Sequence, residues 1–397
     1  MSLQALPGAA AESSGPALRT EFRAFVDATV APIADEVDRS QRIPQEVLRA
    51  VADRGYWGAG LPSTVGGSGW GLVTLGALHE EIGRGCSSLR SLLTVHHMVA
   101  AMVSRWGSEP VRARWLAALA AGDALGAFCL TEPEAGSDAA AVATTADRDG
   151  DGYRLTGTKR WITSGQVAHV LLVFARTAQG LTAFLVPSDS PGIRRVPIRD
   201  ALGTRGSMLA EIRLDRVPVD AHAVLGREGA GLMIATSALE LGRYSVANGC
   251  VGILQAALDA CVSYTSRRRQ GGVLLREHQL VRQMISDMVT DVRAARLLCG
   301  HAGHLMDAAD PSAVMATWVA KYHASTSATR CTSNAVQLHG ANGCGGHYGV
   351  ARLFRDAKVM EVIEGSTQIQ QLTIADFAYQ RLADPMRTTR ISEVTGS

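Results

Sequence analysis

The spacing of apolar residues changes twice along this chain, and these changes limit the folds that it can adopt. Over residues 18–121 apolar side chains recur every three or four positions, which is typical of helices. Residues 126–226 instead hold short runs rich in Val, Ile and Leu, bounded by Gly, Pro and Asp, which predict strands. Helical spacing returns over residues 231–381.

This order predicts an α+β fold in which helical domains flank a central antiparallel β-barrel or sandwich. We place the N-terminal helical domain at residues 18–124, the β-domain at 125–226 and the C-terminal helical bundle at 227–383. The polar or low-complexity ends, residues 1–17 and 384–397, are predicted to be disordered. A length of 397 residues is ample for such a division.

Composition and charge exclude several classes of protein. A net charge of +2 argues against nucleic-acid binding and against strong attraction to a membrane surface. No apolar run approaches the roughly 18 residues that a membrane span needs. The seven cysteines are scattered, form no CxxC pair and suggest a reducing compartment. Since the start of the chain lacks the features of a signal peptide, we expect a cytoplasmic protein without a membrane partner.

One carboxylate, Glu364, stands in the stretch VIEGSTQ near the C-terminal end of the helical region. Its neighbours Val362 and Ile363 are apolar, and such surroundings raise the pKa of a carboxyl group toward the range that a general base needs. Gly365 would let a flat cofactor approach the backbone. The alternative is that Glu364 caps a helix, and this segment alone does not decide between the two.

A second set of chemically useful residues opens the β-region, in TEPEAGSD and GTKRWITSG. Thr131, Ser137 and Thr163 offer hydroxyl donors, and Trp161 offers a flat indole, a combination that suits a flavin. Each has an ordinary alternative, since Trp161 could be a core residue and TEPEAGSD a capped turn. A metal site at His339, Cys344 and His347 is disfavoured because a fourth ligand is missing.

Five motifs in this order, TEPEAGSD, KRWITSG, LLREHQLV, QLHGANG and IEGSTQIQQ, resemble the acyl-CoA dehydrogenase family over residues 20–383. The resemblance implies an N-terminal helical domain, a central β-domain and a C-terminal four-helix bundle. It also implies a homotetramer, or a homodimer, whose subunits share FAD sites. FAD is held in this family without a GxGxxG loop, and the electron acceptor is an electron-transfer flavoprotein or oxygen.

The resemblance also implies roles for individual residues. Glu364 is similar to the base that removes the α-proton of an acyl thioester. Implied substrate contacts are Ser137, Glu240, Arg243 and Ile363, although Glu240 could simply pair with Arg243 three residues later. Implied FAD contacts are Phe128, Leu130, Thr131, Ser137, Trp161, Thr163, Gln337, His339, Gly340, Gly343, Ser366 and Gln368, with Arg268 and Gln279 reaching the FAD of a neighbouring subunit.

Two positions depart from the family pattern. Ile363 stands where family members often carry Tyr, and the run Arg268–Gly272 lacks the aromatic residue of the usual turn. The stretches CSSLRSLLT, GRYSVANGCVGIL and AKVMEVIEGS are similar to a subgroup from polyketide and nonribosomal-peptide pathways. That subgroup oxidises acyl groups tethered to a carrier protein.

A carrier protein is acidic, so an arginine rim would suit its docking. The candidates are Arg194, Arg195, Arg199 and Arg205, although a general bias toward arginine also explains them. The alternatives to a carrier-dependent dehydrogenase are a conventional short-chain acyl-CoA dehydrogenase and, in another class, a flavin-binding partner protein without catalytic activity.

Overall fold

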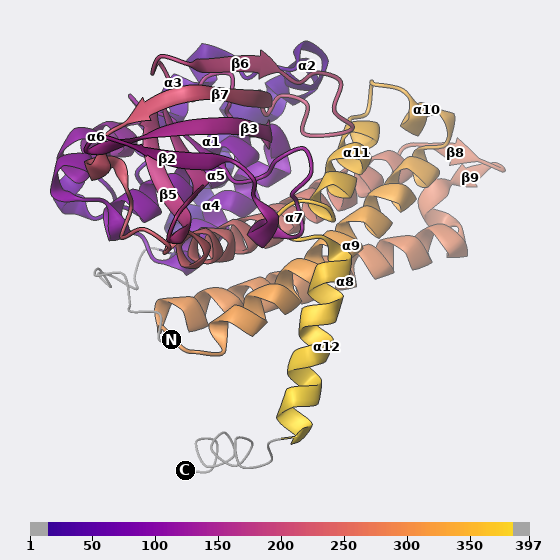
Figure 1. The fold of residues 1–397 in the computed structure, drawn as a ribbon. Helices are drawn as coiled ribbons and strands as arrows, with labels where there is room; N and C mark the ends of the chain where they lie inside the picture. Colours follow the sequence, from indigo (N-terminus) through magenta and orange to yellow (C-terminus); the bar gives the residue numbers. More distant parts are fainter. Residues whose placement is uncertain (1–14, 384–397) are drawn as a thin grey trace.

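The computed structural model describes residues 15–383, in which a sheet lies in front of the N-terminal helices and the C-terminal helices extend to the right and below (Figure 1). The N-terminal helices are α1 (Gly15–Phe25), α2 (Ala34–Ser40), α3 (Gln45–Asp53), α4 (Leu72–Gly85), α5 (Ser87–Trp106) and α6 (Glu109–Ala121). The C-terminal helices are α7 (Gly231–Thr265), α8 (Gln279–Asp307), α9 (Ala313–His339), α10 (Ala341–Cys344), α11 (Val350–Met360) and α12 (Thr367–Ala383). A short hairpin, β8 (Arg269–Gln270) and β9 (Val273–Leu274), joins α7 to α8.

The strands lie between the two helical regions and form one seven-stranded sheet. They are β1 (Gly126–Cys129), β2 (Thr145–Asp149), β3 (Gly152–Ile162), β4 (Val170–Thr177), β5 (Gly180–Pro187), β6 (Ile193–Pro197) and β7 (Ala210–Val219). Their order is β1-β4-β2-β3-β7-β6, with β5 paired to β4. In β3 the register with β7 shifts between Lys159 and Ile162, and this irregularity re-aims the intervening side chains.

The order of helices, strands and helices confirms the predicted fold class. One detail differs, because β1 and β2 both run parallel to β4, so the sheet is mixed rather than wholly antiparallel. Helix α1 begins at Gly15, three residues before the predicted start of the first domain. The other residues predicted to be disordered, 1–14 and 384–397, lie outside the described part of the chain.

Helix α7 is the central element of the bundle and crosses α4 at very close range. A Cβ atom added to Gly83 of α4 would lie 2.8 Å from Cα of Gly249 in α7, and one added to Gly252 would lie 2.1 Å from the Glu80 carbonyl oxygen. Glycine is therefore required at this crossing. Helix α7 is also long and apolar enough to span a membrane, but 72% of the qualifying window is buried inside the protein.

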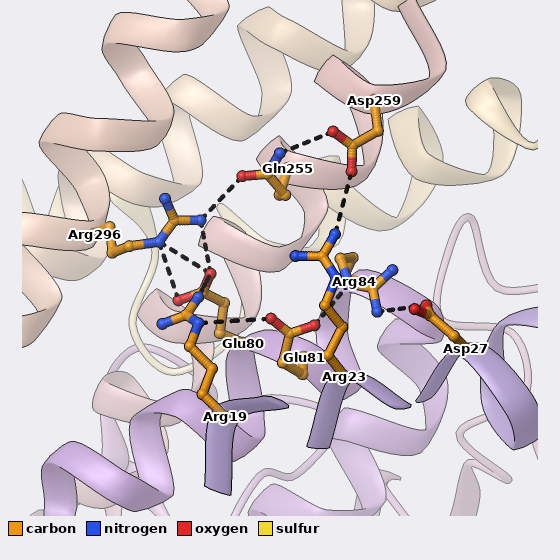
Figure 2. Close-up of polar contacts among 9 residues, drawn as sticks. All are labelled: Arg19, Arg23, Asp27, Glu80, Glu81, Arg84, Gln255, Asp259 and Arg296. Atoms are coloured by element: carbon orange, nitrogen blue, oxygen red, sulfur yellow. Dashed lines mark hydrogen bonds and ion pairs between the residues drawn. The ribbon is translucent and has the colours of Figure 1, made fainter. Parts of the chain in front are cut away.

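A cluster of ion pairs fastens α1 to the bundle (Figure 2). Glu80 and Glu81 of α4 are 4% and 2% exposed. Arg296 of α8 donates to Glu80 at 2.8 Å, and Arg84 donates to Glu81 at 2.7 Å. Arg19 of α1 pairs with both carboxylates. We call these five residues the α4 ion-pair cluster. Each buried carboxylate in it has an arginine partner.

Candidate active site

Glu364 lies in the short connection between α11 and α12, with its backbone in the left-handed region at φ 55°. A non-glycine residue rarely adopts this conformation, and where it does the surroundings must enforce it. Arg243 of α7 donates from Nε to the Glu364 carbonyl at 3.2 Å. Lys321 of α9 and Gln370 of α12 each donate to the Gly365 carbonyl at 2.8 Å. Three helices therefore hold this connection in place.

The Glu364 carboxylate points into the protein and is incompletely paired. Its Oε2 atom is buried and has no hydrogen-bond partner among the described residues. Desolvation raises the pKa of Glu364, against the opposing fields of Arg243, Lys321 and Arg90. The first turn of α12 is capped by Ser366, whose Oγ accepts from the Ile369 backbone N–H at 3.4 Å. The alternative interpretation of Glu364 as a helix cap is therefore wrong.

Gly242 of α7 provides the space for this carboxylate. A Cβ atom at position 242 would lie 2.3 Å from Glu364 Oε2 and 3.0 Å from Met98 Sδ of α5. Any side chain there would displace the acid. The sequence alone gave no reason to select Gly242, since glycine in a helix carries no chemistry of its own and the contact spans more than a hundred residues.

Glu240 and Arg243 form the ion pair that their spacing on one helix predicts. The Arg243 Nη1 to Glu240 Oε1 distance is 2.5 Å, and Trp318 Nε1 donates to the same oxygen at 3.3 Å. The Arg243 guanidinium also lies over the Trp318 ring, 4.1 Å from its centroid. Burial raises the pKa of Glu240, and its Oε2 has no partner among the described residues. Glu240 thus fixes Arg243, which in turn fixes the Glu364 backbone.

Two cations near Glu364 were missed by sequence reasoning. Arg90 of α5 is 1% exposed, has no ion-pair partner in residues 15–383, and hydrogen-bonds Thr94 and Ser91. Burial lowers the pKa of Arg90. Lys321 is fully buried, and desolvation lowers its pKa to about 8. A charged residue within the apolar helix SSLRSLLTVHHMVAAM was a signal that could have identified Arg90.

The residues predicted to surround a flavin ring gather where β1 and β3 end. Arg160 N–H donates to the Thr131 carbonyl at 2.9 Å, which places Trp161 beside Thr131. Trp161 has φ 61° and is 52% exposed. A large flat side chain in a strained conformation, exposed beside the hydroxyls of Thr131 and Thr163, fits the ring of FAD. Leu130 is buried in the hydrophobic core beside β1, and Phe128 packs against that core. Ser137 is exposed on the loop after β1.

A second group of predicted cofactor residues lies at the far end of α7. His339 is buried, stacks on Tyr264 at 4.1 Å between ring centroids and bonds the Ala335 carbonyl. Arg268, Gln279, Gln337 and Gly340 are exposed nearby, and Gly343 is packed against Val336. Tyr264 is 21 residues beyond Arg243, about 32 Å along the helix. Within one chain, the predicted cofactor residues near His339 therefore lie far from Glu364.

The remaining predicted residues are dispersed. Ile363 is half-buried against the helical core, and Gln368 is exposed in the first turn of α12. Of the proposed arginine rim, Arg195 donates to the Ser188 carbonyl and hydroxyl and Arg205 pairs with Asp200, so both are engaged within the chain. Arg194 and Arg199 are exposed. Residues 15–383 contain no cluster of three or more His, Cys, Asp or Glu placed to hold a metal.

Comparison with known proteins places these features in a family. Models of the acyl-CoA dehydrogenase N-terminal, middle and C-terminal domains match residues 15–123, 127–217 and 229–379. The mitochondrial short-chain specific acyl-CoA dehydrogenase of Bos taurus is 36% identical over 366 residues, covering 90% of this chain and 88% of the relative.

Two solved structures are similar along their whole length. FkbI, for biosynthesis of the methoxymalonyl extender unit of the Fk520 polyketide, has a TM-score of 0.84 and 36% identity, covering 90% of this chain and 99% of FkbI. The prolyl acyl carrier protein oxidase AnaB has a TM-score of 0.88 and 25% identity, covering 93% of this chain and 100% of AnaB.

Proposed function

The chain belongs to the acyl-CoA dehydrogenase family of FAD-dependent CH–CH oxidoreductases, and from this premise we propose that Glu364 is its catalytic base, acting on an acyl thioester tethered to a carrier protein. The observation that supports this role is the buried, unpartnered Oε2 of Glu364 above Gly242. A carboxylate with a raised pKa and a free lone pair is suited to accept a proton from carbon.

In the proposed reaction Glu364 removes the α-proton of the acyl group. Trp161, Thr131 and Thr163 would hold the ring of FAD, which would supply the acceptor for the β-hydrogen as it leaves as hydride with its electron pair. The negative charge that develops on the thioester oxygen needs a donor, and in this proposal the donor is the Glu364 backbone N–H. Arg243 and Lys321 hold the connection that carries this N–H by bonding the Glu364 and Gly365 carbonyls. Arg90, Arg243 and Lys321 also favour the ionised form of Glu364, so that the base is available despite its burial.

The carrier-protein part of the proposal is supported by similarity to FkbI and AnaB and by two exposed arginines, Arg194 and Arg199, on and beside β6. The second candidate is a conventional short-chain acyl-CoA dehydrogenase. It is favoured by the 36% identity to the bovine short-chain enzyme over 90% of the chain.

The test is anaerobic bleaching of the visible flavin band, with the same short acyl group offered on CoA and on an acyl carrier protein. We expect faster bleaching by the carrier-bound group. Bleaching by the CoA ester alone would favour the second candidate. No bleaching by either, in protein that retains its flavin, would contradict both and favour a non-catalytic partner protein.

A further inference from the structure

A small cavity lies between α4, α5 and α7, on the side of α7 next to the base. Its volume is about 50 Å³, and its lining includes Leu241, Ser245, Thr94, His97 and His79. Leu241 precedes Gly242, which faces Glu364, and Ser245 lies one helical turn further along α7. The cavity is therefore placed to receive the end of a short acyl group whose α-carbon lies at Glu364. This assignment rests on the proposed function.

The polar side of the cavity is a chain of two histidines, of which His79 is buried and His97 half-buried. Nε2 of His97 lies 2.8 Å from the Tyr56 carbonyl, and Nδ1 of His97 lies 3.3 Å from Nε2 of His79. The remaining nitrogen, Nδ1 of His79, is buried and has no hydrogen-bond partner among the described residues. Desolvation lowers the pKa of His97 to about 4 and that of His79 well below its usual value, so both rings are neutral.

The hydrogen bonds determine which nitrogen carries each proton. A carbonyl only accepts, so His97 Nε2 is the protonated nitrogen and His97 Nδ1 is the acceptor. His79 Nε2 must then carry the proton that it donates to His97. A neutral imidazole has one proton, and His79 Nδ1 is consequently an unpaired acceptor. A buried polar atom in this state is costly unless a ligand or water supplies a donor.

Thr94 and Ser245 on the cavity wall have no hydroxyl hydrogen free to donate to a ligand. Thr94 donates to the Arg90 carbonyl at 2.8 Å. Ser245 must then be the donor in the hydrogen bond between the Thr94 and Ser245 hydroxyl oxygens, which lie 2.5 Å apart. Both hydroxyl hydrogens are therefore used within the chain. Thr94 Oγ1 also accepts from Arg90 Nη1 at 3.0 Å, so the acceptor that these two hydroxyls leave for a ligand is Ser245 Oγ.

From this geometry we infer that His79 is a specificity residue, which selects a short acyl group bearing a hydroxyl by accepting a hydrogen bond at Nδ1. A carboxylate has no proton to donate, so it does not suit this nitrogen. An ammonium group would be buried without a carboxylate, because no acid from the described part of the chain lines the cavity. A hydroxyl donates without bringing charge, and it would replace any water that satisfies the nitrogen in the empty site.

The test measures binding separately from turnover. Amide analogues of the pantetheine arm, shared by CoA and carrier proteins, carry butyryl, 3-hydroxybutyryl or 4-hydroxybutyryl and are titrated calorimetrically into the flavin-loaded protein. We expect one hydroxylated analogue to bind about 10-fold more tightly than butyryl. His79→Phe should remove this preference, and His79→Asn should restore part of it because its amide oxygen also accepts.

The matched control is His96→Asn. His96 is a buried histidine of α5, next to His97, whose two nitrogens bond the Leu119 carbonyl and the Gly126 N–H, and it does not line the cavity. Its replacement should leave the preference unchanged. Equal affinities in the wild-type protein, or a preference that survives His79→Phe, would overturn the inference and leave only water at His79. Flavin bleaching by butyryl thioester in the same preparation would show that the proposed function nevertheless stands.

Discussion

Two groups of buried charge lie beside α7, and they differ in how completely they are paired. In the α4 ion-pair cluster, Glu80 and Glu81 both meet arginines. Around the base, the residues Arg90, Glu240, Arg243, Lys321 and Glu364 form what we call the Glu364 cluster.

The Glu364 cluster holds three buried atoms without a hydrogen-bond partner in residues 15–383: Glu364 Oε2, Glu240 Oε2 and Arg90 Nε. Paired charges can hold helices together, whereas an unpaired buried charge costs stability and remains free to react. The paired charges of the α4 ion-pair cluster therefore stabilise the fold, whereas the incompletely paired charges of the Glu364 cluster are suited to the reaction.

The largest expected difference between the clusters is in the effect of neutralising one acid. Glu364→Gln keeps the shape of the side chain but removes the proton acceptor, and flavin reduction by an acyl thioester should slow by a factor of about 10³ or more. Stopped-flow absorbance under anaerobic conditions measures the rate. Bound flavin and the melting temperature serve as controls, and both should be retained. A variant that still reduces flavin within about tenfold of the wild-type rate would mean that Glu364 is not the base.

A displacement of the base, without loss of its charge, should have the second largest effect. Gly242→Ala places a Cβ 2.3 Å from Glu364 Oε2, and movement of a reacting group by about 1 Å costs roughly 10²-fold in rate. The matched control is Gly300→Ala in α8, where an added Cβ meets no atom within 4 Å. That control should be as active as the wild type. Equal rates for the two variants would contradict the placement of Glu364 against Gly242.

In the paired cluster the same kind of change should affect stability and leave the reaction intact. Glu80→Gln leaves Arg296 without a carboxylate and Arg19 with Glu81 alone, 3.7 Å away. We expect a loss of about 1–2 kcal/mol in unfolding free energy, because both arginines are about one-third exposed. Urea titration followed by circular dichroism measures the loss. Asp259→Asn, in a half-exposed pair with Arg23, is the control and should change stability by roughly 0–0.5 kcal/mol. Reduced flavin bleaching in stably folded Glu80→Gln would erase the distinction between the clusters.

The smallest expected effect concerns pH. The pKa of Glu364 is higher in the folded protein than in the unfolded chain, so folding takes up a proton between the two values and stability falls as pH rises through that window. Glu364→Gln lacks this cost. It should be slightly more stable than the wild type at neutral pH, and the difference should vanish below the ordinary pKa of glutamate. Melting curves of both proteins, recorded in parallel from acidic to neutral pH, measure this difference in stability. A difference that grew toward acidic pH would contradict the prediction.

The sequence predicted the features that are local in the chain. The order of helices and strands follows from apolar spacing, and Glu364 stood out because its apolar neighbours are adjacent in sequence. Gly242 and Lys321 could not be predicted in this way, since each reaches Glu364 only through the packing of α7 and α9 against the connection before α12. Arg90 stands out locally as a charge in an apolar helix, but its position near Glu364 also depends on packing. The parallel pairing of β1 with β4 was also missed, because strand direction depends on the path of the intervening chain.

The glycine crossing of α4 and α7 has a consequence for engineering. At Gly83, Gly249 and Gly252 the helices meet backbone to backbone, so no rotamer there can change to make room for a larger ligand. The width of the adjoining cavity is consequently set by main-chain positions. Attempts to broaden the substrate range by directed evolution should therefore gain little from this crossing. The productive library positions are side chains that line the cavity, such as Leu75, Ala101 and Leu241.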